Sequence, residues 1–252
     1  MTADSPGLMA ASLVVHRQQE TLGAGADLNR GLDLLSEVRS GARPAMLRLY
    51  RPQPTVAFGQ RDTRLPGYAK AARAAAARGF VPAVRRAGGR AAAYHEGTLV
   101  VDHIQPEADA IAGAKARFGF FGELFTEALR SLGLDAGVGE IPGEYCPGEF
   151  SVFGRVPGPA AGPGRGLEGA LKLAGTAQRV VAGAWLFSSV IVVENSAPIR
   201  DVLVDTYSAL GLEWDPHTAG AAEDLVPGIT VDAVEAAVLA VYARHAKLLT
   251  ES

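Results

Sequence analysis

The sequence predicts an α/β (α+β) fold. Along the chain, segments with apolar residues at helical spacing alternate with short segments typical of strands. In the strand-like segments, apolar and polar residues alternate, or all residues are apolar. Turn residues separate these segments, which indicates hairpins as well as crossovers. With 252 residues, 48% of them hydrophobic, the chain can bury one sizeable core, and we expect a single domain over residues 1–252.

In the first half of the chain we expect two helices and four strands. The first helix begins after Asp27, a good N-cap residue, and ends before Gly41. The second helix, over residues 68–78, is alanine-rich and ends at Gly79. Strands are expected at residues 46–50, 55–58, 81–85 and 99–104, of which the last two are expected to be buried.

The second half repeats the alternation without repeating the sequence. Helices are expected at residues 118–132, 199–210 and 231–247, and strands at residues 150–153, 171–173 and 185–193. Between them, residues 154–169 contain six glycines and three prolines. This composition disfavours helix and central strand and predicts a mobile loop, either a surface insertion or a lid over a substrate.

Composition excludes several classes of protein. The net charge of −3 and the pI near 6.0 give no reason to expect nucleic acid or an anionic membrane as a partner. One cysteine cannot form an internal disulfide or a cysteine-based zinc site, so we expect a reducing, cytoplasmic location. The short apolar run at residues 8–15 lacks a preceding positive segment, and no apolar run approaches the roughly 18 residues of a membrane span.

The histidines do not predict a metal site. His16, His103, His217 and His245 are dispersed, with no second ligand at metal-binding spacing, so we expect them to be surface or hydrogen-bonded residues.

The one cysteine, Cys146, lies in the stretch GEYCPGEFSV. Pro147 and Gly148 demand a turn, which places the thiol at the entrance of a strand, within reach of solvent. An exposed thiol can act as a nucleophile, whereas the alternative is a small buried hydrophobic residue.

Lys172 lies in an alternating strand, within LKLAGTAQR, that is expected to run into a bend at residues 175–177. If residues 149–153 and 171–174 form the arms of a hairpin closed by the Gly/Pro loop, Lys172 and the Cys146 turn meet at one end. A lysine near a thiol favours the thiolate.

The stretch VRRAGGRAAAYHEG supplies a third set of candidate residues. Gly88 and Gly89 follow paired arginines, and the small residues after them leave room for a ligand close to the backbone. The spacing fits neither a Walker nor a dinucleotide-binding motif. Arg90 is expected to point to solvent.

Taken together, these blocks resemble the biotin/lipoate A/B protein ligase family. The resemblance extends from DLNRGLDLLSEVRSGARPAMLRLYRPQPTVAFGQRD through RRAGGRAAAYHEGTL to GEYCPGEFSV and LKLAGTAQRVVAGAWLF. It implies the lipoate/biotin protein ligase-like fold, a curved mixed sheet flanked by helices, with an acyl chain in a tunnel beside the Gly-Gly turn. The EYCPG block is most similar to the cysteine-dependent amidotransferases that move octanoyl or lipoyl groups from glycine cleavage H protein to other lipoyl domains.

The resemblance also implies roles for individual residues. Cys146 attacks the acyl group on a donor protein and passes it to a lysine of a second protein. Lys172 favours the thiolate and holds the acyl carbonyl, while backbone N–H groups near residues 175–177 are candidates for the oxyanion site. The residues that the resemblance places at the acyl-binding site are Gly59, Arg86, Gly88, Gly89, His95, Gly175, Thr176, Ala177 and Gln178, and His95 is not expected to be catalytic.

Three functional hypotheses stay open. The first is a protein octanoyl/lipoyl transferase that needs no cofactor and takes its acyl group from glycine cleavage H protein or acyl carrier protein, for delivery to lipoyl domains such as those of E2 subunits. The second is an ATP-dependent lipoate ligase using Lys172, the only case in which ATP and Mg²⁺ would take part. The third is a non-catalytic protein that binds acyl groups or lipoyl domains.

Several departures from the family pattern weaken the assignment as a ligase. Ligases usually carry three glycines after the paired arginines, and many carry a histidine in the segment that here reads AWLFSSVIVV. We also expect no C-terminal accessory domain, because the chain ends soon after its last predicted helix. Biotin ligation is disfavoured, since the Gly-Arg loop of that group is matched only superficially by Gly89 and Arg90.

Overall fold

The computed structural model describes residues 8–156, 167 and 169–251. Its helices are α1 (Ala24–Arg39), α2 (Tyr68–Ala77), α3 (Ala114–Ser131), α4 (Ser196–Leu210) and α5 (Val231–Tyr242), with short 3₁₀ turns η1 (Asp62–Arg64), η2 (Pro216–Thr218) and η3 (Ala222–Asp224). Its strands are β1 (Ser12–Gln18), β2 (Met46–Tyr50), β3 (Thr55–Phe58), β4 (Val81–Val84), β5 (Ala92–Tyr94), β6 (Thr98–Pro106), β7 (Ala136–Val138), β8 (Val152–Arg155), β9 (Ala170–Val181), β10 (Ala184–Val192) and β11 (Lys247–Thr250).

These strands form two sheets. The large sheet has the order β11-β1-β2-β6-β10-β9-β8-β7, and the small sheet has the order β4-β3-β5. Strand β1 is parallel to both β2 and β11, and β3 is parallel to β4, whereas the remaining neighbours are antiparallel. The expected mixed sheet with flanking helices is therefore confirmed.

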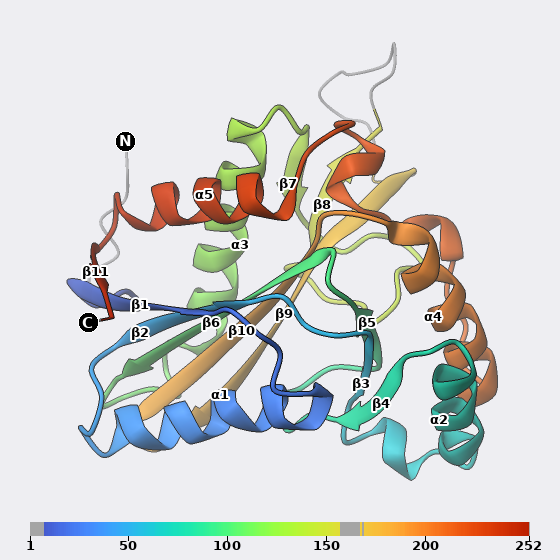
Figure 1. Ribbon diagram of the computed structural model, residues 1–252, viewed down its shortest axis with the longest axis horizontal. Helices are drawn as coiled ribbons and strands as arrows, with labels where there is room; N and C mark the ends of the chain where they lie inside the picture. The colour runs from blue at the N-terminus through green and yellow to red at the C-terminus, as the bar shows by residue number, and fades with distance from the viewer. Residues whose placement is uncertain (1–7, 157–166, 168, 252) are drawn as a thin grey trace.

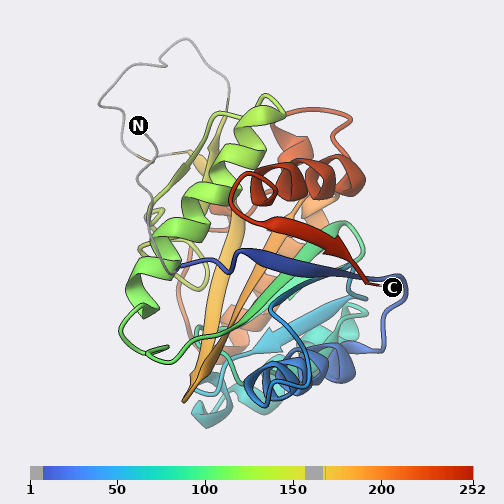
Figure 2. The same ribbon diagram turned by 90° about the vertical axis from the view of Figure 1, so that its left-hand side faces the viewer.

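The helices cover the large sheet on both faces. Helix α1 packs on one face, against β6 and β10, and α3 and α5 pack together on the other (Figures 1 and 2). Helices α2 and α4 pack against each other beside the small sheet (Figure 1). The main apolar core lies between the large sheet and the α3/α5 pair, around Phe121, Phe125, Trp185 and Phe187.

The predicted hairpin between the cysteine region and the lysine strand is present as β8 and β9. These strands pair antiparallel, with Phe153 opposite Lys172 and Val152 opposite Ala174. Most of the intervening Gly/Pro segment, residues 157–166 and 168, lies outside the described residues, so the expected mobile loop stays a prediction.

Two local predictions in the first half were wrong. Helix α1 begins at Ala24, with Gly23 at its N-cap, because the carboxylate of Asp27 is buried and accepts a hydrogen bond from Arg48 at 3.2 Å. Strand β4 is not buried: Val81 is 43% exposed, since β4 is an edge strand of the small sheet.

Two predictions in the second half also needed correction. Helix α5 ends at Tyr242, and Lys247 belongs to β11, which pairs in parallel with β1 at the edge of the large sheet. The bend expected at residues 175–177 does not form, since β9 continues through them and pairs with β10 up to Val181. In the described residues, no helix is long and apolar enough to cross a bilayer.

Candidate active site

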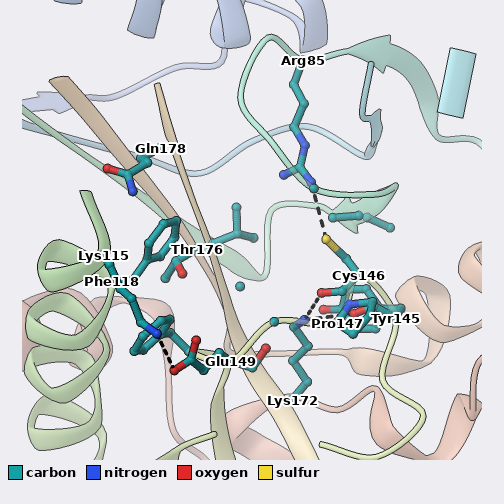
Figure 3. Close-up of a pocket in the computed structure, with 18 of the residues that line it drawn as sticks. Arg85, Lys115, Phe118, Tyr145, Cys146, Pro147, Glu149, Lys172, Thr176 and Gln178 are labelled. Atoms are coloured by element: carbon teal, nitrogen blue, oxygen red, sulfur yellow. Dashed lines mark hydrogen bonds and ion pairs between the residues drawn. The ribbon is translucent and has the colours of Figure 1, made fainter. Parts of the chain in front are cut away.

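A cavity of about 460 Å³ lies where the two sheets meet. Its walls come from β5 of the small sheet, β9 and β10 of the large sheet, the start of α3 and the loop at residues 145–151. The apolar part of the lining includes Ala92, Ala93, Phe118, Tyr145, Phe150 and Val190. Cys146 lies at one end of the cavity, and Phe118 and Gln178 lie at the other (Figure 3).

The cavity exists because β8 is much shorter than β9. Strand β8 pairs with β9 only as far as Ala174, so that the β9 edge beyond this residue has no partner strand among the described residues. Gly175, Thr176 and Gln178 line the cavity at this open edge. The predicted strand around Lys172 thus leads directly into the site.

Cys146 has an unusual backbone conformation. Its φ of 45° lies in the left-handed region, which side chains other than glycine rarely adopt. Its N–H donates to the Tyr207 hydroxyl at 2.9 Å, and its carbonyl accepts from the Lys172 ammonium at 2.8 Å. Strained backbone held by bonds on both sides is typical of functional positions.

Two donors from the Gly-Gly turn approach the sulfur of Cys146. The backbone N–H of Arg90 lies 3.1 Å from Sγ, and Nη2 of Arg85 lies 3.7 Å from it (Figure 3). Arg85 is itself held by a 2.6 Å hydrogen bond to the carbonyl of Arg90. A backbone dipole and a guanidinium therefore both favour negative charge on the sulfur.

Lys172 reaches the cysteine loop but not the thiol. Its ammonium is buried and lies 2.7 Å from Oε2 of Glu144 and 2.9 Å from the carbonyl of Tyr145, in addition to its contact with Cys146. The ammonium donates hydrogen bonds to these two backbone carbonyls, and the Glu144 carboxylate is its ion-pair partner. We expected Lys172 to lie beside the sulfur of Cys146. Instead, it contacts the backbone carbonyls of Tyr145 and Cys146.

Glu144 ties the cysteine loop together. It is 3% exposed, and its Oε1 accepts from the N–H groups of Ile141 at 3.2 Å and Gly148 at 3.3 Å. The ion pair with Lys172 compensates the buried charge, and removing either partner alone would leave the other uncompensated.

Tyr207 joins the cysteine loop to the Gly-Gly turn. The Tyr207 hydroxyl accepts a hydrogen bond from the N–H of Cys146 and donates one to the carbonyl of Ala91 at 2.9 Å. Burial raises the pKa of Tyr207 well above its usual value, and a charge on Cys146 raises it further. The hydroxyl therefore remains a neutral donor in this position. Burial likewise raises the pKa of Tyr145.

The two glycines of the turn have different surroundings. Gly89 lines the cavity with a φ of 98°, and a Cβ added there would lie 2.9 Å from the sulfur of Cys146. Gly88 is exposed, and a Cβ added there would meet nothing within 4 Å. Gly59 packs directly against the Gly-Gly turn, because a Cβ added at Gly59 would lie 2.0 Å from the carbonyl oxygen of Gly89. Close approach of backbone therefore requires glycine at positions 59 and 89.

Arg90 does not point to solvent. It is half-buried, and its guanidinium lies 3.1 Å from Oδ1 of Asp62, which is fully buried. Asp62 also accepts from the N–H of Gly59 at 2.8 Å. This carboxylate fixes the side chain of Arg90 and thereby the N–H group that faces Cys146.

The remaining predicted residues are distributed around two cavities. Arg86 and Ala177 line a smaller cavity of about 60 Å³ on the α1 side, which shares Arg85 and Gly175 with the larger one. His95 lines neither cavity: Nε2 lies 2.9 Å from the carbonyl of Asn195, and Nδ1 accepts from Gly97. Its surroundings are those of a buried residue that stabilises a turn.

The sequence did not single out Glu144, Tyr207 or Asp62. Glu144 lies two residues before the cysteine and could have been noticed as a carboxylate close to the candidate nucleophile. Tyr207 is 61 residues from Cys146, and no local signal indicated its contact.

Solved structures of known proteins share this fold. A bipartite lipoate protein ligase from Thermoplasma acidophilum, solved with its E2 lipoyl domain, matches with a TM-score of 0.65 at 19% identity, covering 96% of this chain and 88% of that one. A lipoate-protein ligase A bound with ATP matches with a TM-score of 0.66 at 20% identity, covering 97% and 90%. The fold is therefore that of the lipoate-protein ligases.

The family model of the lipoyl protein ligase A/B catalytic domain matches residues 31–242. The chain belongs to this family, and the resemblance inferred from the sequence is confirmed.

Curated relatives of this chain have names that state a particular activity. The octanoyl-[GcvH]:protein N-octanoyltransferase of Geobacillus kaustophilus is 28% identical over 196 residues, covering 78% of this chain and 64% of that protein. The protein of the same name from Anoxybacillus flavithermus is 30% identical over 173 residues, covering 66% and 55%. The chain thus spans less than two thirds of the length of these relatives.

Proposed function

We propose that this protein transfers octanoyl or lipoyl groups between lysines of lipoyl-domain proteins through a thioester on Cys146. The observation that carries the proposal is the position of the sulfur at the end of an apolar cavity, facing Arg85 and the N–H of Arg90. The names of the curated relatives support octanoyl as the acyl group and a glycine cleavage H protein as the donor.

The proposed reaction has two steps. In the first, the sulfur of Cys146 attacks the carbonyl carbon of the donor's acyl-lysine amide; a C–S bond forms, the C–N bond breaks, and the departing amine gains the proton that the thiol loses. In the second, the neutral amine of an acceptor lysine attacks the thioester, the C–N bond forms, and the proton returns to the thiol. One amide replaces another, so the overall transfer needs no ATP and no cofactor.

Arg85 and Arg90 act on the sulfur in this proposal. The guanidinium of Arg85 and the N–H of Arg90 stabilise the thiolate, which is the nucleophilic form. The open edge of β9 beyond Ala174 keeps the N–H groups near residues 175–177 as candidates for the oxyanion site.

Lys172 acts as a positioning residue. Because its ammonium donates to the carbonyls of residues 145 and 146 and forms an ion pair with Glu144, it holds the strained loop rather than an acyl carbonyl or a phosphate. This arrangement favours the transferase over the ligase alternative, which requires Lys172 to bind an acyl-adenylate.

Transfer kinetics with and without ATP test the proposal. Octanoylated H protein and an unmodified lipoyl domain, incubated with the enzyme and no nucleotide, should exchange the octanoyl group, as followed by the intact mass of both proteins. A strict requirement for ATP and free octanoate would establish the ligase instead. Binding of the octanoylated protein without any turnover would establish the non-catalytic alternative.

A further inference from the structure

The basic residues of this acidic chain are unevenly distributed. Residues 61–90 contain eight Lys or Arg residues and one acidic residue, Asp62, although the whole chain has a net charge of −3. This segment comprises η1, α2, β4 and the Gly-Gly turn. The total charge of the chain conceals a local excess of positive charge.

Several exposed arginines elsewhere on the surface are neutralised by nearby carboxylates. Exposed Arg17, Arg51 and Arg244 each lie within 2.6 Å of a Glu or Asp oxygen. In contrast, Arg61, Arg64 and Arg86 are exposed and form no ion pair within the described part of the chain. We call these three residues the basic rim.

The basic rim is attached to the structure that holds the cysteine. Arg61 and Arg64 flank Asp62, which fixes Arg90 and thereby the N–H group at the sulfur of Cys146. A hydrogen bond of 3.2 Å from Gln60 to the carbonyl of Arg85 joins the same turn to the paired arginines. Arg61 and Arg64 therefore lie on a turn that is bonded directly to the residues contacting the reactive thiol.

We propose that the basic rim docks an acidic surface around the acylated lysine of the carrier protein. This inference rests on the proposed function and adds the chemistry of the partner. A lysine side chain entering the cavity brings its carrier against the surface next to Cys146, where exposed arginines attract carboxylates and orient the approach. Charges at the rim of an interface act mainly on the rate of association and its salt dependence.

The test compares a protein donor with a small donor. The Arg61→Glu/Arg64→Glu variant is measured beside Arg179→Glu/Lys247→Glu, which changes the net charge equally at two exposed cations that also form no ion pair within the described residues. The donors are octanoylated H protein and octanoyl-N-acetylcysteamine, a thioester without a protein surface. Formation of the Cys146 adduct is followed by intact mass.

We expect kcat/KM for the protein donor to fall about tenfold or more in the rim variant at low salt, and this gap to close near 0.5 M NaCl. The small donor should react equally with both variants and the wild type. An unchanged kcat/KM for the protein donor, or an equal loss in the control variant, would overturn the docking proposal. ATP or nucleic acid binding at the rim without this loss would also overturn it. Failure of the proposed function is distinguishable, since the wild type would then form no adduct with either donor.

Discussion

The ammonium of Lys172 donates to the carbonyl oxygen of Cys146 at 2.8 Å. The lysine therefore acts on the backbone of the nucleophile, and the sulfur takes its polar contacts from Arg85 and the N–H of Arg90. This division separates two tasks: one set of residues holds the strained loop, and the other stabilises charge on the sulfur. Substitutions of the two sets should have different consequences.

Replacing Lys172 should destabilise the protein as well as slow the reaction. Lys172→Met leaves the charge of Glu144 buried without compensation, which costs about 3–5 kcal/mol of the free energy of unfolding. Lys172→Met/Glu144→Gln should recover much of this loss, because the amide oxygen can still accept from Ile141 and Gly148. Adduct formation should stay slow in both variants. Urea denaturation and adduct kinetics check this, and a stable, fully reactive Lys172→Met would contradict the positioning role.

Arg85→Gln should reduce the reactivity of the thiol without unfolding the protein. Loss of the guanidinium 3.7 Å from the sulfur removes stabilisation of the thiolate, so alkylation by iodoacetamide at pH 7 should slow about tenfold. Arg64→Gln, which removes an arginine with no contact to the sulfur, serves as the control. Equal alkylation rates in the two variants would show that Arg85 does not act on Cys146.

The two glycines of the turn offer a matched pair of substitutions. Gly89→Ala places a methyl group 2.9 Å from the sulfur and strains a φ of 98°, whereas Gly88→Ala places it in open space. We expect Gly89→Ala to lose most adduct formation and Gly88→Ala to retain most of it, as measured with octanoyl-N-acetylcysteamine. Similar behaviour of the two variants would refute the close approach of Gly89 to the sulfur.

His103 should make stability depend on pH. Its ring lies 4.8 Å from that of Trp185 and 5.0 Å from that of Phe121, and burial lowers its pKa from 6.5 to about 3. Between these values the unfolded chain binds a proton that the folded chain does not, so the free energy of unfolding falls as the pH falls. This contribution amounts to a loss of about 2 kcal/mol at pH 5 relative to pH 8.

Urea denaturation of the wild type and His103→Phe at both pH values isolates this effect. The wild type should lose about 2 kcal/mol more than the variant on acidification. If both proteins lose the same amount, His103 is not the group responsible.

Local sequence patterns predicted much of the fold. Apolar periodicity located α3 and β10, and the pairing of residues around Phe153 with the strand of Lys172 followed from the turn residues between them. Positions where a distant partner decides the structure were predicted less well. Asp27 is a residue type that commonly caps helices, but buried Arg48 binds its carboxylate, and the helix begins four residues earlier than expected.

The candidate site shows the same division. Cys146 and the Gly-Gly turn were recognisable in the sequence, because a cysteine beside Pro-Gly and paired glycines are local signals. The contact between Lys172 and Glu144, and that between Tyr207 and Cys146, depend on tertiary packing. Gly88 and Gly89 are adjacent and alike in the sequence, but they differ in backbone conformation and in what lies opposite each of them.

The identity of the acylated atom decides whether Cys146 is the nucleophile. The wild type and Cys146→Ala are mixed with octanoylated H protein without ATP, quenched in acid, and measured by intact mass and peptide mapping. We expect one octanoyl group on the peptide that contains Cys146 in the wild type, removable by neutral hydroxylamine, and none in a Cys146→Ala variant with an unchanged circular dichroism spectrum. Octanoyl transfer to a lipoyl domain by Cys146→Ala at the wild-type rate would contradict the thioester mechanism.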